Sequence, residues 1–299
     1  MPCAVLCCVV LCCAVLCDAG YEALSVFKQL RHCGVPLSCA LHLRLFRALA
    51  KYRGHTFEAQ RPPLAAFASL RVDITTDYLL QQLRNDGVPL DSSLVCGLLG
   101  LHRYPAQWHL SRHDQQAEGV PSCLAAGGVT ASRLAVQQAV QLLETCCARE
   151  GQEQGQGGLQ VDEDMLVELI RVCCAGQHVD LALDIIASAR DATSPRRTEE
   201  SGLAASAHSR GGEGVAYAVP PSAAMFAPLL TLYCRRRGGE ALRQAEGLLV
   251  LMNGSGSGSG GEEGGGGGYG VAPTSAMLGQ VLDRHWRWDR GGSEEGGED

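Results

Sequence analysis

The chain has 299 residues, of which 46% are hydrophobic, 5% are aromatic and 37 are glycine, and its formal net charge is −7. This composition predicts a globular chain with flexible stretches. A net charge of −7 lacks the basic footprint of most nucleic-acid-binding proteins, but eleven of the 32 acidic residues and only three of the 25 basic ones lie in Gly/Ser/Gln-rich segments or the tail. The rest of the chain is near neutral, so the charge does not exclude nucleic acid.

The cysteines indicate a reducing compartment. There are 15 of them, several in adjacent pairs, and no CxxC spacing occurs. Clustering within apolar runs and the odd count favour reduced, buried thiols over a disulfide framework or a zinc finger.

The chain begins with an apolar run, MPCAVLCCVVLCCAVLC, at residues 1–17. The run is short for a membrane span, and no basic residue precedes it as in a signal peptide. We therefore predict a buried helix and no membrane association, with a targeting or membrane segment as the alternative. No Arg- and Ser-rich transit peptide is visible.

Two stretches of the chain are nearly the same: QLRHCGVPLS at 29–38 and QLRNDGVPLD at 82–91. A pattern begins at their Val-Pro-Leu and covers residues 35–46 and 88–99. It recurs more loosely at 159–170, 219–230 and 271–282. Its fourth position can cap a helix, and its apolar seventh, eleventh and twelfth positions lie on one helical face. Each segment therefore predicts the start of an amphipathic helix, and the capping residues are Ser38, Asp91, Asp162, Ser222 and Thr274.

Apolar residues at helical spacing also predict second helices over 18–34, 76–87, 132–150, 178–190 and 240–254. Alternation of a capped helix with a second helix is typical of an α-solenoid, so we predict an all-α fold in a single domain over 1–299. The repeat starts are unevenly spaced because low-complexity insertions occur at 151–158, 192–214 and 254–270. The acidic tail 291–299 is expected to be disordered, and the segments 53–75 and 105–131 have no readable pattern.

The segment VDEDMLVELIRVCCAGQHVDLALDIIASA at 161–189 resembles a pentatricopeptide repeat. Ala182, Leu183 and Ile186 match the second helix of that motif, and Cys174 and Gly176 match its turn. The resemblance implies a right-handed solenoid of helix-turn-helix repeats that binds single-stranded RNA. It also implies a role in a mitochondrion or chloroplast, in RNA processing, stability or translation. A generic helical repeat is the alternative.

In the family, one base is read per repeat by two or three side chains. The resemblance assigns one of these roles to the capping residues Ser38, Asp91, Asp162, Ser222 and Thr274. Their first-helix partners are Leu43, Cys96, Val167, Ala227 and Gly279, whose side chains cannot hydrogen-bond a base edge. We therefore expect no sequence reading by this code, and helix capping is the favoured role of the five residues.

Contact with RNA phosphates remains open to a set of basic residues near the ends of first helices. These are Lys51, Arg53, Arg235, Arg236, Arg237, Arg284 and Arg287. The alternative is that they are solvated cations that interact with the dipoles of their helices.

No motif predicts an enzyme, a cofactor site or a small-molecule substrate. His102, His109, His113 and Cys123 are the nearest approach to a metal site, but their spacing matches no common one, so we predict no metal. The expected partner is single-stranded RNA. The alternatives are a protein-binding scaffold in an organellar ribonucleoprotein, and the repeat part of a ribonuclease without its nuclease domain.

Overall fold

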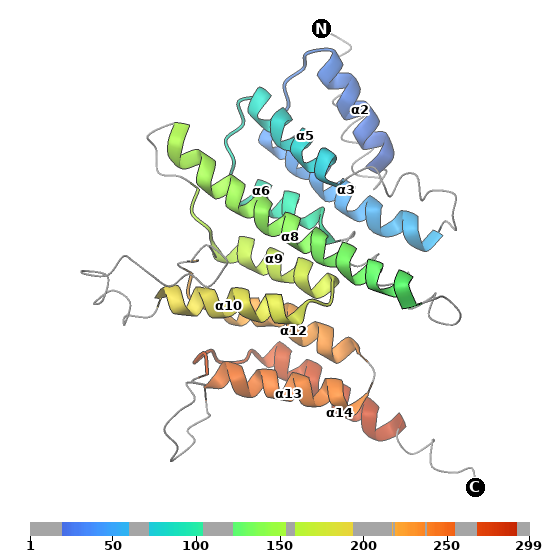
Figure 1. The fold of residues 1–299 in the computed structure, drawn as a ribbon, viewed down its shortest axis with the longest axis vertical. Helices are drawn as coiled ribbons and strands as arrows, with labels where there is room; N and C mark the ends of the chain where they lie inside the picture. The colour runs from blue at the N-terminus through green and yellow to red at the C-terminus, as the bar shows by residue number, and fades with distance from the viewer. Residues whose placement is uncertain are drawn as a thin grey trace, which may run out of the picture. The chain divides into compact units, whose positions relative to one another are not determined.

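The computed structural model describes residues 20–59, 72–103, 122–153, 159–193, 217, 219–236, 238–254 and 268–291. Within these ranges every regular element is an α-helix, which confirms the all-α prediction (Figure 1). The apolar run 1–17, for which a buried helix is predicted, lies outside the described residues.

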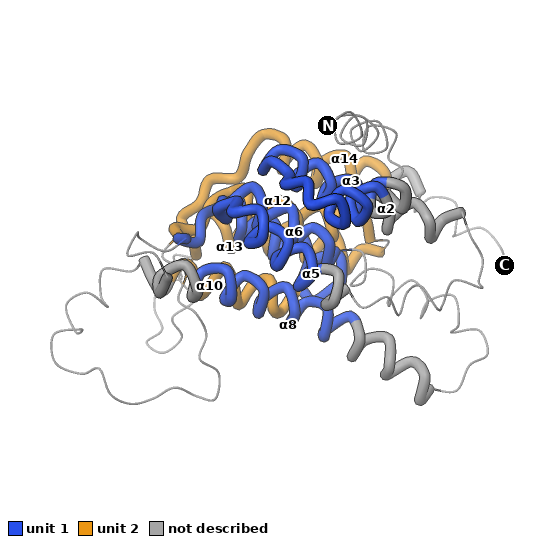
Figure 2. The backbone as a smooth tube through the Cα atoms, turned by 90° about the horizontal axis from the view of Figure 1, so that it is seen from above, with its two compact units in different colours: residues 1–178 blue, residues 179–299 orange. Residues whose placement is uncertain are grey.

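The chain divides into two compact units, residues 1–178 and residues 179–299 (Figure 2). The described helices of unit 1 are α2 (Gly20–His32), α3 (Cys39–Ala59), α5 (Val72–Asn85), α6 (Ser92–Gly100), α8 (Ser122–Glu153) and α9 (Glu163–Ala175). Those of unit 2 are α10 (Val179–Thr193), α12 (Ala223–Arg235), α13 (Gly239–Asn253) and α14 (Ser275–Gly291).

The five predicted first helices are α3, α6, α9, α12 and α14, and each begins directly after its predicted cap. The Leu94 amide donates to Asp91 Oδ1 at 2.8 Å, and the Met165 amide donates to Asp162 Oδ1 at 2.9 Å. Thr274 Oγ1 accepts from an amide of α14 at 3.3 Å. The capping prediction is therefore confirmed at these three positions, whereas Ser222 makes no side-chain cap hydrogen bond.

The predicted second helices also form, as α2, α5, α8, α10 and α13, but several limits differ from the prediction. α8 begins at Ser122 and continues to Glu153, so residues 151–153 of the first predicted insertion are helical. α10 continues to Thr193, so residues 192–193 of the second predicted insertion are helical. α14 continues to Gly291, so the first residue of the predicted tail is also helical. Helix formation extends into these polar segments because a helix that is already nucleated adds residues at little cost.

The turns that follow α2, α5 and α9 share one backbone conformation. Gly34 and Gly87, the glycines of the two similar stretches, have φ of 67° and 64°. The amide three positions after the last helical residue donates back to a carbonyl of the last turn, from Val35 to Leu30 and from Val88 to Leu83, each at 3.0 Å. The turn after α9 has the same hydrogen bond, but its left-handed residue is Gln177, with φ of 57°.

Replacing Gln177 with glycine is therefore expected to stabilise unit 1, by up to about 1 kcal/mol, because a side chain at positive φ is sterically disfavoured. The measurement is the midpoint of urea denaturation, which should rise. Gly87→Ala places a side chain in the same conformation and should lower the midpoint by a similar amount. An unchanged or lower midpoint for Gln177→Gly would contradict the prediction.

The first helices pack side by side in each unit. In unit 1, α3 contacts α6 and α6 contacts α9, while in unit 2 α12 contacts α14. Gly97 on α6 permits close approach, because a Cβ there would lie 3.2 Å from Phe46 of α3. Second helices pack against this layer, as α2 does on α3 and α13 on α12.

The apolar positions of the repeat pattern form the core. We count Val35, Val88, Leu159, Val219 and Val271 as position one of each segment. Position twelve is fully buried in four first helices, as Phe46, Leu99, Ile170 and Leu230. In α14 the same position is Leu282, which is 60% exposed, whereas Met277 and Val281 at positions seven and eleven are 4% and 5% exposed. The apolar face predicted for α14 is therefore only partly buried.

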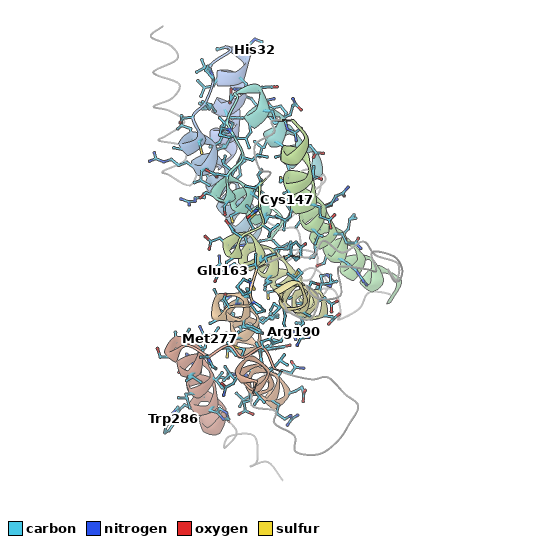
Figure 3. The ribbon with its side chains drawn as sticks, turned by 90° about the vertical axis from the view of Figure 1, so that its left-hand side faces the viewer. His32, Cys147, Glu163, Arg190, Met277 and Trp286 are labelled. Carbon is cyan, nitrogen blue, oxygen red and sulfur yellow. The ribbon has the colours of Figure 1, made fainter. Side chains whose placement is uncertain are left out.

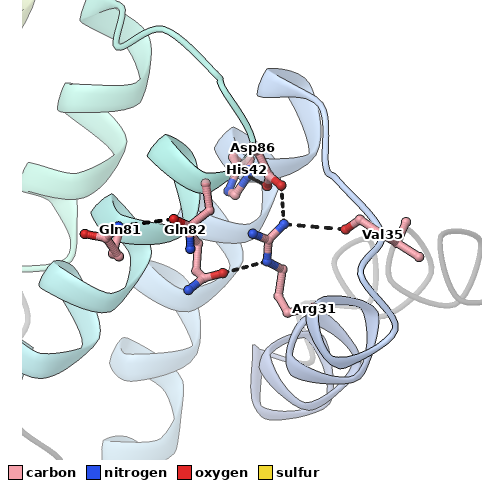
Figure 4. A network of polar contacts seen from close by, with 7 residues as sticks. Arg31, Val35, His42, Gln81, Gln82 and Asp86 are labelled. Carbon is pink, nitrogen blue, oxygen red and sulfur yellow. Dashed lines mark hydrogen bonds and ion pairs between the residues drawn. The ribbon is translucent and has the colours of Figure 1, made fainter.

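A buried polar network connects the two similar stretches (Figure 4). Arg31, at the end of α2, donates to Gln82 of α5 at 2.6 Å and forms an ion pair with Asp86. His42 of α3 shares the same carboxylate at 2.8 Å, and the side chains of His42 and Asp86 are 0% and 2% exposed. The second copy of the stretch supplies Asp86 where the first has Cys33, so the network joins three helices.

The network makes the stability of unit 1 sensitive to acid. Burial lowers the pKa of His42 below its ordinary 6.5, although Asp86 partly opposes this. Burial would raise the pKa of Asp86, but hydrogen bonds from Arg31 and His42 outweigh it and lower that pKa. Both groups bind protons more readily in the unfolded chain, so both stabilise the fold less as pH falls.

We therefore expect the free energy of unfolding to decrease as the pH falls below about 6.5, where an unfolded histidine titrates, and again below about 4, where an unfolded aspartate does. Urea denaturation at pH 7.5, 6.5 and 5.5 measures the first decrease. His42→Gln keeps an N–H donor but does not titrate, so its decrease over this range should be smaller. Equal slopes in the two proteins would contradict the assignment.

Candidate functional site

Two contacts place α12 and α14 side by side and parallel in unit 2. Thr231 Oγ1 donates to Gln280 Oε1 at 3.5 Å, and one turn further along both helices Arg284 Nη2 donates to the backbone carbonyl of Arg236 at 2.8 Å. The C-terminal halves of the two helices therefore lie at the same end of the unit. Helix C-termini favour cations because their carbonyl groups carry partial negative charge.

Three arginines at this end form what we call the arginine cluster: Arg235, Arg236 and Arg284. Arg235 is exposed, Arg284 is half-buried, and the Arg236 guanidinium lies 5.9 Å from the centre of the Tyr233 ring. The cluster raises the local positive potential. This potential acts to lower the pKa of the nearby Cys234 thiol, but burial is the larger effect and the pKa is raised.

Three carboxylates of α13 and α14 contact side chains outside the arginine cluster. Glu240 pairs with Arg243 at 2.6 Å and Asp283 with Arg287 at 2.6 Å. Glu246 accepts from His285 at 2.5 Å. Two of these acids, Glu240 and Asp283, are therefore paired with arginines that lie outside the cluster. Arg287, which is among the predicted phosphate ligands, is one of the neutralising residues.

The remaining predicted phosphate ligands are not placed with these residues. Lys51 and Arg53 belong to the C-terminal half of α3, and their side chains lie outside the described part of the structure. Arg237 also lies outside the described residues. Of the seven basic residues predicted from the sequence, the structure brings together Arg235, Arg236 and Arg284, with Arg287 on the same helix as Arg284.

The predicted base-reading edge of unit 1 is acidic. Asp91 and Asp162 use a carboxylate oxygen for helix capping, and Glu163 and Asp164 occupy the first turn of α9. The thiol of Cys39 also lies 3.7 Å from Asp91 Oδ2. A phosphate would be repelled along this edge, because like charges at short range are unfavourable.

The first-helix partners of these caps do not offer hydrogen bonds to bases. Leu43 lies 3.3 Å from the position of a Cβ on Gly97, and Val167 is 6% exposed, so both belong to the packing between helices. Burial raises the pKa of Cys96 to about 11, which keeps this thiol protonated. Ala227 and Gly279 have no polar side-chain atom. The structure thus gives no support to base reading at these positions.

A feature that the sequence pattern missed lies on α14. Leu278, Leu282 and Trp286 are 44%, 60% and 64% exposed and follow one another at intervals of four residues, so they form one stripe along the helix (Figure 3 labels Trp286). We call these three residues the α14 stripe. The sequence pattern placed Leu282 on the apolar face of its helix but could not show whether another segment covers that face.

Among the residues that the structure describes, no three His, Cys, Asp or Glu side chains gather as a metal site. His109 and His113 lie outside these residues, and His102 is buried at the end of α6. Over the same residues, no helix has both the length and the apolar character that a membrane span requires.

No protein-family model matches the chain, and no curated protein is significantly similar to it.

Proposed function

We propose that this chain is a non-catalytic, pentatricopeptide-like helical-repeat protein, a right-handed α-solenoid, that binds single-stranded RNA in organellar RNA processing, stability or translation. The observation that carries the proposal is the contact of Arg284 with the Arg236 carbonyl. It holds cations of α12 and α14 together at one end of unit 2, where Glu240 and Asp283 pair with other arginines.

In this function the arginine cluster contacts phosphates, because guanidinium groups match phosphate oxygens in geometry and charge. Phosphate contacts carry no sequence information. The first-helix residues that would read bases together with the capping residues cannot hydrogen-bond a base edge. Binding is therefore expected to depend weakly on base sequence and strongly on salt.

The test replaces the three arginines together, as Arg235/Arg236/Arg284→Gln, and titrates the full chain with a 20-nucleotide single-stranded RNA over a range of salt concentrations. Each lost phosphate contact removes about 0.7 from the slope of log affinity against log salt, so the slope should become shallower by about 2. The affinity at low salt should fall about tenfold or more.

The matched control removes three exposed arginines of unit 1, as Arg44/Arg47/Arg84→Gln, and should leave the slope nearly unchanged. Circular dichroism checks that the cluster variant is folded, since Arg284 also contacts the α12 terminus. No binding by the wild-type chain, or equal losses in both variants, would contradict the proposal.

A second candidate function is a protein-binding scaffold, and the acidic edge of unit 1 favours it. Asp91, Asp162, Glu163 and Asp164 would repel RNA but would attract a basic protein surface. If the chain fails to bind RNA, and neutralising Glu163 and Asp164 abolishes the binding of a basic partner protein, the scaffold function replaces the first proposal.

A further inference from the structure

A second group of arginines lies where α6 packs against α9 in unit 1. Arg103, three residues beyond the end of α6, forms an ion pair with Glu168 of α9, and Arg171 donates to the same carboxylate oxygen at 3.3 Å. The Glu168 side chain is 7% exposed, whereas those of Arg103 and Arg171 are 42% and 51% exposed. We call these three residues the Glu168 clamp, because one buried carboxylate holds two guanidinium groups that both reach the solvent.

The clamp keeps positive charge and free donors at the surface. Glu168 neutralises only one of the two guanidinium groups, so one net positive charge remains. Arg103 and Arg171 each use one Nη atom on the carboxylate, whereas a guanidinium group has five N–H donors. The two Nη atoms contact the same oxygen and therefore lie within roughly 6 Å of each other. One phosphate group can accept hydrogen bonds from both arginines at this spacing.

Stability alone explains the clamp poorly. A buried ion pair stabilises a fold only when its remaining donors and acceptors are also paired. Glu168 Oε1 and Arg103 Nε are buried, and neither has a hydrogen-bond partner among the described residues. The clamp therefore includes two buried polar atoms that cost stability, while it fixes two exposed guanidinium groups in place.

The helices of the clamp pack in the same register as those of the arginine cluster. A Cβ on Gly100, at position 13 of α6, would lie 3.3 Å from Glu168 Oε1, at position 10 of α9. In unit 2, Thr231 at position 13 of α12 contacts Gln280 at position 10 of α14. The two pairs of first helices therefore pack in one register, although they belong to different units.

This register gives the two pairs arginines at similar positions. The earlier helix carries Arg103 at position 16 in unit 1 and Arg235 at position 17 in unit 2. The later helix carries Arg171 at position 13 in unit 1 and Arg284 at position 14 in unit 2. Each pair of helices thus places an arginine of one helix near an arginine of its neighbour.

In both pairs an arginine also crosses to the neighbouring helix, as Arg103 does to Glu168 and Arg284 does to the Arg236 carbonyl. We infer that the Glu168 clamp is a second phosphate site, where Arg103 and Arg171 together hold one phosphate group of the RNA. The inference rests on the proposed function, and it gives unit 1 the kind of contact that the arginine cluster makes in unit 2.

The acidic edge of unit 1 does not prevent this contact. Arg171 lies seven residues beyond Asp164, which is about 10 Å along α9. This distance is close to the Debye length of about 10 Å at 0.1 M salt, so the repulsion of a phosphate at the clamp is largely screened.

Titration of the full chain with a 20-nucleotide single-stranded RNA, over a range of salt concentrations, tests the inference on Arg103→Gln, Arg171→Gln and the double variant. Because the two arginines hold one phosphate, the double variant should lose about 0.7 from the slope of log affinity against log salt. Its affinity at about 0.1 M salt should fall about tenfold. Each single variant should lose nearly as much, since one guanidinium group alone does not enclose the phosphate.

The matched control is Arg44/Arg47→Gln, which removes the same charge from exposed positions of α3 and should leave the slope nearly unchanged. Arg171→Lys keeps a cation that pairs with phosphate, so it should retain most of the slope. Circular dichroism checks the fold of each variant. Arg171→Gln keeps the test valid if the double variant is unstable, because Glu168 still pairs with Arg103 and a half-exposed pair contributes little to stability.

A double variant with the wild-type slope and affinity would overturn the inference, and loss of binding by the arginine-cluster variant would show that the proposed function still holds. A loss equal to that of Arg44/Arg47→Gln would also overturn it, because it would indicate only the general charge of unit 1. Small, additive losses in the two single variants would exclude a shared phosphate. A wild-type chain that binds no RNA would contradict the proposed function itself, and the inference with it.

Discussion

Replacing Asp86 with alanine is expected to lower the free energy of unfolding by about 3 kcal/mol, because it leaves the half-buried Arg31 and the buried His42 without their shared carboxylate. The Asp86 side chain is 2% exposed and is shared by Arg31 and His42, which come from two different helices. Its loss also removes an acceptor of two hydrogen bonds in a site that water cannot easily enter. Urea denaturation followed by circular dichroism measures the change.

The control is Asp77→Ala on α5, the helix that ends just before Asp86, where the aspartate is exposed and the change should stay within about 0.5 kcal/mol. Arg31→Met in the Asp86→Ala background should recover part of the loss, since it removes the unpaired charge. Hydrogen exchange of α3 and α5 should show that the loss lies in unit 1. Equal stability of the two aspartate variants would contradict the role of the network.

Gly268→Ala is expected to destabilise unit 2 by about 2 kcal/mol or more, because the added methyl group would overlap backbone atoms. A Cβ at Gly268 would clash with the Cα of Gly254 and lie 2.8 Å from the Leu251 carbonyl oxygen. At this point the chain returns to the end of α13, where the Tyr269 and Val271 amides donate to the Leu251 and Met252 carbonyls at 3.0 and 2.7 Å.

The displaced segment would also lose the contacts of Tyr269, whose ring lies 5.1 Å from the Phe226 ring and 5.0 Å from the Arg190 guanidinium. We therefore expect faster hydrogen exchange in α14, which follows this segment, as well as a lower urea midpoint. Gly247→Ala is the matched control, because this glycine lies in the exposed face of α13 with open space around it. That change should stabilise the helix by up to about 1 kcal/mol. Loss of stability in both variants would contradict a specific clash at Gly268.

The helices were predictable because their signals are local. A capping side chain needs only the amide three residues later, and Asp91 and Asp162 make this contact as predicted. The glycine stops after α2 and α5 are equally local, since a left-handed residue favours glycine whatever surrounds it. The capping interpretation of Asp91 and Asp162 is confirmed, whereas their role in RNA binding stays a prediction.

The candidate site was only partly predictable. The basic residues could be named from the sequence, but their grouping depends on the register of α12 against α14, which joins Arg284 to the Arg236 carbonyl. Pairing of Arg287 with Asp283 follows from helical spacing and could have been anticipated. The acidic edge of unit 1 could not, because it requires that the starts of α6 and α9 lie near each other.

The amino-acid pattern is sufficient for the helices, their caps and their apolar faces, because these depend on neighbours within about one helical turn. It is not sufficient for the fate of an apolar face, because burial depends on which segment packs against it. Leu230 and Leu282 occupy the same position of the same pattern, yet the first is fully buried and the second is 60% exposed. The difference arises from long-range packing, which buries Leu230 of α12 but leaves Leu282 of α14 exposed.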